Sequence, residues 1–256
     1  SGCLYGLRRY LRFHASERYP NRRKSIRRLW NAVQRKDFRK RRLHRNRRLY
    51  ELQNAEATAS AIRQAFDKLI NSVQEGDIIY IHFSGHGQQV TDLNGDEEDG
   101  FDEAWIPIDA QFSYAKGKYE GENHIIDDQL NQWLSQLRSK VGATGKITVV
   151  ADACHSGGGS RAAKDKTEYV VRGTAGAFVI PGSAKPFSGE VGTIDWIFIS
   201  ACKSNQCNRE YKGTGSLTYA LGQQKEKLSS TPAQQLQRSI CSIIANIIPF
   251  TQTPVL

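Results

Sequence analysis

The fold is decided by the stretch Asp77-Ile-Ile-Tyr-Ile-His-Phe-Ser-Gly-His-Gly87. Residues 77–83 form a short apolar run of β-branched and aromatic side chains, which is typical of a buried strand, and the run stops at a histidine between two glycines. A second stretch, Lys146–Gly157, repeats this arrangement with Asp152-Ala-Cys-His-Ser-Gly157 at its end. Parallel strands end at the same edge of a sheet, so we expect His86 and Cys154 to meet there.

The rest of the chain alternates between helical and extended patterns. Apolar side chains recur at helical spacing over residues 58–73, with Thr58 as the expected cap, and again over residues 127–137 and 236–247. Residues 196–201 predict a third strand, and residues 104–108 predict an edge hairpin strand because Pro107 cannot donate to a central ladder. This alternation predicts an α/β sandwich of three layers with a mostly parallel central sheet.

Positive charge is concentrated at the beginning of the sequence. Of the 36 Lys and Arg residues, 18 lie in residues 1–50, against only Glu17 and Asp37. We therefore predict a basic segment of uncertain structure over 1–50 and one globular domain over 51–256. The segment is either a solvated charged stretch or an arm that binds nucleic acid, as charge asymmetry can indicate.

Composition also excludes several classes of protein. No run approaches the roughly 18 apolar residues of a membrane span. The five cysteines include no CxxC pair, so neither a disulfide framework nor a zinc site is indicated. We expect a cytoplasmic chain that makes no use of a membrane.

Cys154 and His86 are the residue types that nucleophilic catalysis requires. A thiol attacks as its thiolate, and an imidazole within reach can accept its proton or protonate a leaving amine. The neighbouring glycines allow tight turns and expose backbone N–H groups that can stabilise an oxyanion. His155, next to Cys154, is the alternative partner for the thiol.

Three ordered motifs resemble the metacaspase family, in particular its bacterial members, the orthocaspases. They are Phe83-Ser-Gly-His-Gly-Gln88, the acidic run Asn94–Glu103 that leads to Pro107-Ile-Asp109, and Asp152–Gly157. The resemblance implies a caspase-like fold and a cysteine endopeptidase with a Cys154–His86 dyad. It assigns the backbone N–H groups of Gly87 and Cys154 to the oxyanion.

The resemblance also implies cleavage after Arg or Lys. In the family, the residues that match Ser84 and Asp152 line the pocket for this basic side chain, and a buried carboxylate suits a guanidinium or ammonium group. A further aspartate of the family's pocket is here Gly6. Expected partners are peptide or protein substrates, with the chain acting as a monomer.

Many metacaspases are activated by calcium, and no other cofactor is expected. Asp102, Asp127 and Asp128 match three of the family's calcium ligands, whereas Arg161 stands at the fourth position. Calcium takes several oxygen ligands, so the three carboxylates either bind it with help from waters and carbonyls or belong to a solvated acidic loop.

Self-processing is a further expectation for an enzyme that cleaves after basic residues. Candidate sites in the loop after Cys154 are Arg161, Lys164, Lys166 and Arg172, which are otherwise ordinary loop charges. Two alternatives to the main hypothesis stay open. One is a caspase-fold peptidase of other specificity, and the other is an inactive caspase-fold module with a basic arm that binds nucleic acid.

Overall fold

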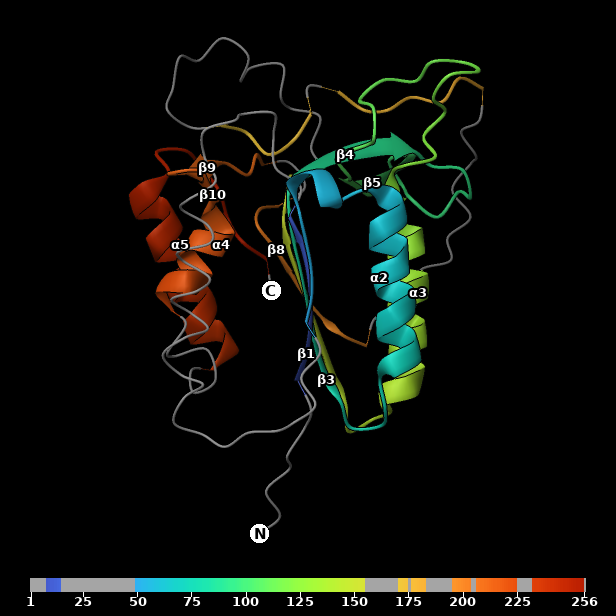
Figure 1. The fold of residues 1–256 in the computed structure, drawn as a ribbon. Coiled ribbons are helices and arrows are strands. Elements are labelled where there is room, and N and C mark those ends of the chain that lie inside the picture. The colour runs from blue at the N-terminus through green and yellow to red at the C-terminus, as the bar shows by residue number, and fades with distance from the viewer. Residues whose placement is uncertain are drawn as a thin grey trace.

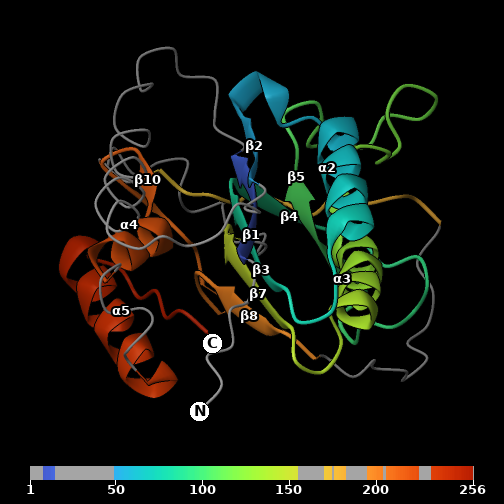
Figure 2. The ribbon, with the colours of Figure 1, turned by 60° about the horizontal axis from the view of Figure 1, so that its bottom comes forward.

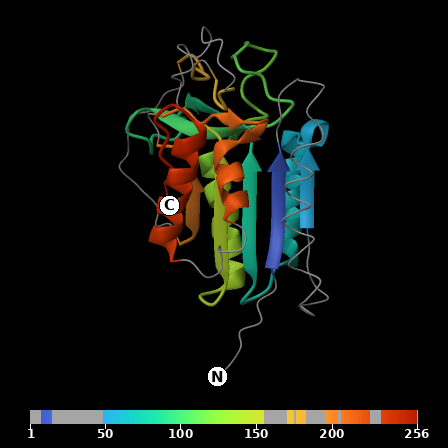
Figure 3. The ribbon, with the colours of Figure 1, turned by 90° about the vertical axis from the view of Figure 1, so that its left-hand side faces the viewer.

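A five-stranded parallel sheet forms the centre of the computed structural model. The structure describes residues 49–154, 170–174, 176–182, 195–203, 206–224 and 232–255, together with the backbone of residues 8–14. The strand order is β2-β1-β3-β7-β8, and all four pairings are parallel. Figure 3 shows these strands side by side and pointing the same way. Their bounds are Arg8–His14 (β1), Leu49–Gln53 (β2), Ile78–Ser84 (β3), Lys146–Asp152 (β7) and Ile197–Ser200 (β8).

Helices cover both faces of this sheet. Helices α2 (Ala59–Ser72) and α3 (Asp127–Val141) lie on one face, and α4 (Ser216–Gln223) and α5 (Ala233–Ile247) lie on the other (Figures 1 and 2). This arrangement confirms the predicted three-layer α/β sandwich, and its sheet is parallel throughout.

Two apolar cores hold the layers together. The larger one packs α2 and α3 against β3 and β7 and includes a stack of the Phe66 and Trp133 rings, whose centroids are 4.3 Å apart. The other packs α4 and α5 against Val150 and Ile199. Burying a side chain such as Phe or Leu contributes about 1.5–3 kcal/mol, so these cores fix the sheet from both sides.

Several elements begin and end where the sequence indicates. The Thr58 side chain caps α2 by accepting a hydrogen bond from the Ala61 N–H at 3.2 Å, as expected for a threonine before a helix. The strands predicted at 77–83, 146–151 and 196–201 correspond to β3, β7 and β8 within one or two residues. The helix predicted at 236–247 corresponds to α5, which begins three residues earlier.

The basic N-terminal segment contributes to the sheet. Strand β1 lies between β2 and β3, and each of its seven residues pairs with a residue of β3. The sheet therefore draws on both sides of the boundary that we predicted at residue 50.

A small antiparallel sheet lies beyond the carboxyl ends of the parallel strands (Figure 1). Its order is β4-β5-β6, so β5 is the middle strand and the prediction of an edge strand at 104–108 was wrong. Pro107 follows the last residue of β5 and never enters the ladder, which removes the objection to a central position. The bounds are His86–Thr91 (β4), Phe101–Ile106 (β5) and Ile125–Ile126 (β6).

The remaining elements are short. A hairpin of β9 (Glu210–Tyr211) and β10 (Thr214–Gly215) precedes α4, and the 3-10 turn η1 (Asn54–Glu56) precedes α2. None of the helices in the described ranges has the length and apolar character needed to cross a bilayer.

Candidate active site

The candidate dyad follows two neighbouring strand ends. Ser84 of β3 pairs with Asp152 of β7, and the Gly85 N–H donates to the Asp152 carbonyl at 3.3 Å. His86 and Cys154 each stand two residues beyond this last pair. The register of the sheet therefore delivers both residues to the same edge, as expected from the sequence.

His86 is the first residue of β4 and is half-buried. Its partner in the ladder is Ile106 of β5, and its ring meets the Phe112 ring edge-on with centroids 6.2 Å apart. The glycine-rich motif thus both ends one strand and begins another, which the sequence analysis did not predict. His155 lies outside the described residues.

The Cys154 thiol is buried beside a second thiol. Cys154 and Cys202 each donate from Sγ to the Gln206 carbonyl oxygen, both at 3.2 Å. The hydrogen bond with Cys154, followed by burial, raises the pKa of the Cys202 thiol above its usual range. Cys202 therefore stays a neutral thiol at neutral pH and shares the Gln206 carbonyl with Cys154.

Two backbone donors converge on one oxygen next to this thiol. The Gly87 N–H and the Cys154 N–H donate to the Arg172 carbonyl oxygen at 3.2 and 3.1 Å. These are the two donors that the family resemblance assigned to an oxyanion. Paired N–H groups aimed at one carbonyl oxygen can stabilise negative charge that develops on it.

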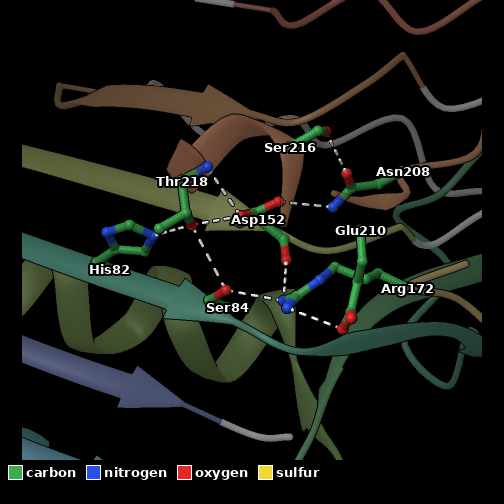
Figure 4. Close-up of polar contacts among 8 residues, drawn as sticks. All are labelled: His82, Ser84, Asp152, Arg172, Asn208, Glu210, Ser216 and Thr218. Atoms are coloured by element: carbon green, nitrogen blue, oxygen red, sulfur yellow. Dashed lines mark hydrogen bonds and ion pairs between the residues drawn. The ribbon is translucent and has the colours of Figure 1, made fainter. Parts of the chain in front are cut away.

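The Arg172 side chain occupies the predicted pocket and is almost fully buried (Figure 4). Its Nη1 donates to Ser84 Oγ at 2.8 Å and to the Asp152 carbonyl oxygen at 3.4 Å. Its Nη2 forms an ion pair with Glu210 Oε1 at 3.1 Å. Ser84 and Asp152 thus both contact the Arg172 guanidinium. The Glu210 carboxylate supplies the negative charge that neutralises this guanidinium.

The Asp152 carboxylate is fully buried and faces the polar wall of this pocket (Figure 4). Its Oδ1 accepts from Asn208 Nδ2 at 2.8 Å, and its Oδ2 accepts from the Thr218 N–H at 2.9 Å and from the Thr218 hydroxyl. Thr218 Oγ1 also lies 3.0 Å from His82 Nε2. Asp152 therefore anchors the pocket wall through its carboxylate and contacts the guanidinium through its carbonyl.

A cluster of carboxylates lies in the acidic loop that follows β4 and at the start of β5. Asp92, Asp96 and Asp102 offer oxygens that all lie within 4.8 Å of one another. In the described part of the chain, the Oδ1 atoms of Asp96 and Asp102 are buried without a hydrogen-bond partner. Oxygens at this spacing fit a calcium ion, whose ligands lie at about 2.3–2.6 Å from the metal.

Asp127 and Asp128 extend this cluster from the start of α3. Burial, then the charges of Glu103 and Asp102, raises the pKa of Asp127 to about 8. Burial and the charge of Asp128 raise the pKa of Asp102 to about 7. Burial and the neighbouring negative charges both disfavour the ionised form, so these carboxylates favour a proton or a bound cation.

Comparison with known proteins identifies the family of this chain. A family model described as metacaspase, peptidase C14 domain, matches residues 24–160. This chain belongs to the metacaspase family. The description of that family is of a peptidase domain.

Curated metacaspases match over a shorter region. Metacaspase-1 of Pyricularia oryzae is 36% identical over 104 residues, which are 40% of this chain and 23% of that protein. Metacaspase-1B of Aspergillus fumigatus is 39% identical over 101 residues, which are 39% of this chain and 22% of that protein. The matched region is thus less than a quarter of the length of these relatives.

A solved structure extends the similarity to most of the fold. The crystal structure of protein GSU0716 from Geobacter sulfurreducens superposes with a TM-score of 0.54 at 25% sequence identity. The match covers 82% of this chain and 76% of that one. The metacaspase chain therefore shares an architecture already observed by crystallography.

Several residues of the metacaspase site were missed in the sequence analysis. No sequence motif includes Asn208, Glu210 or Thr218. Their contacts form only because the chain folds back against β7. Asp92 and Asp96 stand in the acidic run, where spacing alone does not separate ligands from solvated charges. Gly6, Arg161, Lys164 and Lys166 lie outside the described residues.

Proposed function

We propose that this metacaspase is an endopeptidase that cleaves after Arg or Lys by means of Cys154 and His86. The observation that supports it most strongly is the placement of one arginine. Its carbonyl oxygen accepts from Gly87 and Cys154, while its guanidinium contacts Ser84 and the Asp152 carbonyl. A substrate arginine in the same position would present its carbonyl carbon beside the nucleophile.

The proposed reaction follows from these contacts. The Cys154 thiolate attacks the carbonyl carbon, and the negative oxygen is stabilised by the Gly87 and Cys154 N–H groups. His86 accepts the thiol proton and gives a proton to the leaving amine. A water molecule then hydrolyses the thioester and restores the thiol.

The pocket chemistry supports selection of a basic side chain. Ser84 Oγ and the Asp152 carbonyl accept hydrogen bonds, and the Glu210 carboxylate supplies a negative charge in a buried setting. A neutral side chain would leave that carboxylate without its cation, which is unfavourable in a desolvated site. Arginine suits the pocket best because it donates to all three acceptors at once.

Calcium activation is proposed on the acidic loop. Asp92, Asp96 and Asp102 would hold the ion, with Asp127 and Asp128 adding negative charge from α3. The buried Oδ1 atom of Asp102 is the observation in favour, because a cation would satisfy it. The ion would order the loop that joins β4, which begins with His86, to β5.

Monomeric action, a cytoplasmic location, self-processing and the orthocaspase subtype stay predictions from the sequence.

A peptide-library cleavage assay with and without calcium tests the proposal. We expect cleavage after Arg and Lys, no activity in Cys154→Ala and unchanged activity in Cys241→Ala, whose residue lies on α5. Full activity of Cys154→Ala would refute the proposal. Cleavage after other residues would favour a caspase-fold peptidase of different specificity.

The basic segment supports one alternative, an inactive module that binds nucleic acid. Replacing the Lys and Arg residues of 15–48 by Gln leaves the residues of β1 in place and tests this alternative. Strongly salt-dependent binding to DNA or RNA that this replacement abolishes would favour it, provided that no peptidase activity is found.

A further inference from the structure

Cys202 is a buried nucleophilic residue that the proposed reaction does not use. It stands two residues beyond the end of β8, just as Cys154 stands two residues beyond the end of β7. The two strands are neighbours in the sheet, with Ala151 paired to Ser200 and the Ala201 N–H donating to the Ala151 carbonyl at 3.0 Å. The sheet therefore delivers a second thiol to the edge where the first one lies.

The two thiols lie together. A hydrogen bond links Cys202 to Cys154, and both thiols donate to the Gln206 carbonyl oxygen at 3.2 Å. Gln206 is itself held in place by Thr253. Its side-chain oxygen accepts from the Thr253 N–H at 2.7 Å, and its side-chain nitrogen donates to Thr253 Oγ1 at 3.3 Å. The C-terminal segment thus fixes the acceptor that the two thiols share.

This placement suits a disulfide. Linked cysteines usually have Cα atoms roughly 4.4–6.8 Å apart, and neighbouring strands of a sheet run about 4.8 Å apart. The space beside Cys154 is also limited, because a Cβ atom built on Gly173 would lie 3.3 Å from Cys154 Sγ. A separate thiol molecule therefore has less access to this sulfur than Cys202, which is already in contact with it.

We propose that Cys154 and Cys202 form a reversible disulfide when the protein meets a peroxide, and that the disulfide inactivates the nucleophile. Formation of the bond is independent of the proposed function, whereas its effect on peptide cleavage rests on that function.

The oxidation consumes a peroxide and releases water. The Cys154 sulfur attacks one peroxide oxygen as its thiolate, the O–O bond breaks, and the departing oxygen takes the proton that Cys154 gave up. Cys154 is then a sulfenic acid. The Cys202 sulfur bonds to the Cys154 sulfur, the S–O bond breaks, and the Cys202 proton leaves with that oxygen as water. The two thiols have together lost two electrons, which the peroxide has accepted.

The environment of each thiol sets the order of these steps. The hydrogen bond with Cys154, followed by burial, raises the pKa of Cys202, so Cys202 offers little thiolate to a peroxide. Cys154 is therefore oxidised first and Cys202 resolves it. The disulfide protects Cys154 from further oxidation to a sulfinic acid, which thiol reductants do not reverse.

Disulfide mapping of the full chain tests this inference. The reduced protein is treated with a small excess of hydrogen peroxide, weighed intact, and digested without reductant for mass spectrometry. We expect a loss of two hydrogen atoms and a linked peptide pair that joins Cys154 to Cys202, both reversed by dithiothreitol. A Cys154 that stays reduced or becomes only a sulfinic acid, or one that links to Cys3, Cys207 or Cys241, would overturn the inference.

Two variants separate the roles of the cysteines. Cys202→Ser cannot form the link, so peroxide should convert its Cys154 to a sulfinic acid that dithiothreitol does not restore. Cys241→Ser, on α5, is the matched control and should form and release the disulfide as the unmodified chain does. Recovery of the Cys154 thiol in Cys202→Ser as complete as in the unmodified chain would contradict the role of Cys202.

Cleavage of an arginine peptide separates this inference from the proposed function. We expect peroxide to abolish activity at the rate at which the disulfide forms, and dithiothreitol to restore it. If the reduced chain cleaves no peptide, the proposed function fails, and the mapped disulfide still decides the inference. If the reduced chain cleaves peptides but peroxide yields no link between Cys154 and Cys202, only the inference is overturned.

Discussion

Two acidic residues, Glu210 and Asp152, lie at the Arg172 guanidinium, and only Glu210 meets it with its carboxylate. Its carboxylate reaches the guanidinium at 3.1 Å, whereas the Asp152 carboxylate is bound to Asn208 and Thr218. The two acids thus have different tasks. Under the proposed function, Glu210 would pair with the substrate cation, and Asp152 would hold Asn208 and Thr218 in place.

Replacing Glu210 by Gln should weaken the binding of arginine substrates. A hydrogen bond to a charged group contributes about 1.5–3 kcal/mol, so we expect kcat/KM for arginine peptides to fall by about 10- to 100-fold. The comparison is best made in the Arg172→Gln background, which removes the internal arginine. Glu56→Gln, an exposed acid on η1, is the control and should change nothing; equal kcat/KM values for both variants would contradict this role.

The raised pKa values of Asp102 and Asp127 predict how stability depends on pH. An unfolded aspartate titrates near 3.9, while in the folded chain the pKa values are about 7 and about 8. Between about pH 4 and 8 the folded state therefore holds protons that the unfolded chain has lost, so stability falls as pH rises.

Calcium should reverse this trend by replacing the protons. We expect Tm without calcium to decrease from pH 5 to pH 8, and the increase in Tm on adding calcium to be larger at pH 8. Thermal unfolding at both pH values measures this, and Asp102→Asn should reduce both effects. An identical calcium shift at the two pH values would contradict the assignment.

At the scale of elements, Gly215 joins the β9–β10 hairpin to α4 at a point of close contact. A Cβ atom there would lie 2.0 Å from Asp152 Oδ2, which is well inside contact distance. Gly215 can therefore lie this close to Asp152 of β7 only because it has no side chain.

Gly215→Ala should displace α4 from Asp152. We expect a loss of about 1–3 kcal/mol in the free energy of unfolding, as for other overpacked sites, and a marked drop in activity on arginine peptides. Gly176→Ala is the matched control, because nothing lies within 4 Å of its added Cβ. Denaturant unfolding measures the stability of both variants, and peptide cleavage measures their activity. Equal values for the two variants would contradict this prediction.

The elements also show how far the sequence could be interpreted alone. Strands β3 and β7 are continuous apolar runs with sharp ends, so Ser84, His86, Asp152 and Cys154 could be placed at one sheet edge. Glu210 lies in a two-residue strand without periodicity, and only the folded chain brings it to Arg172. Pro107 was misjudged because its effect depends on whether it lies inside or just after a strand.

At the scale of the whole molecule, the sheet depends on its N-terminal strand. Strand β1 pairs on both sides, with β2 and with β3. Without it, β2 would lose its neighbour and β3 would be left with a row of unpaired backbone groups.

A chain that starts at residue 49 should therefore fold poorly. We expect it to lack the cooperative thermal transition that we expect of the full chain. The variant with Gln in place of the Lys and Arg residues of 15–48 is the control and should unfold cooperatively. A truncated chain with an unchanged Tm would show that β1 is dispensable, and would restore the view of residues 1–50 as a separate arm.

The tight packing of Gly173 against Cys154 has a consequence for medicinal chemistry. A peptidomimetic built on Val170-Val171-Arg172, with an aldehyde or ketone in place of the amide, would carry its reactive carbon where the thiol already meets the chain. A Cβ atom added at Gly173 would lie 3.0 Å from the Cys154 carbonyl oxygen and 3.3 Å from its Sγ. Bulk beyond the reactive carbon therefore has little room, and compact warheads suit this scaffold best.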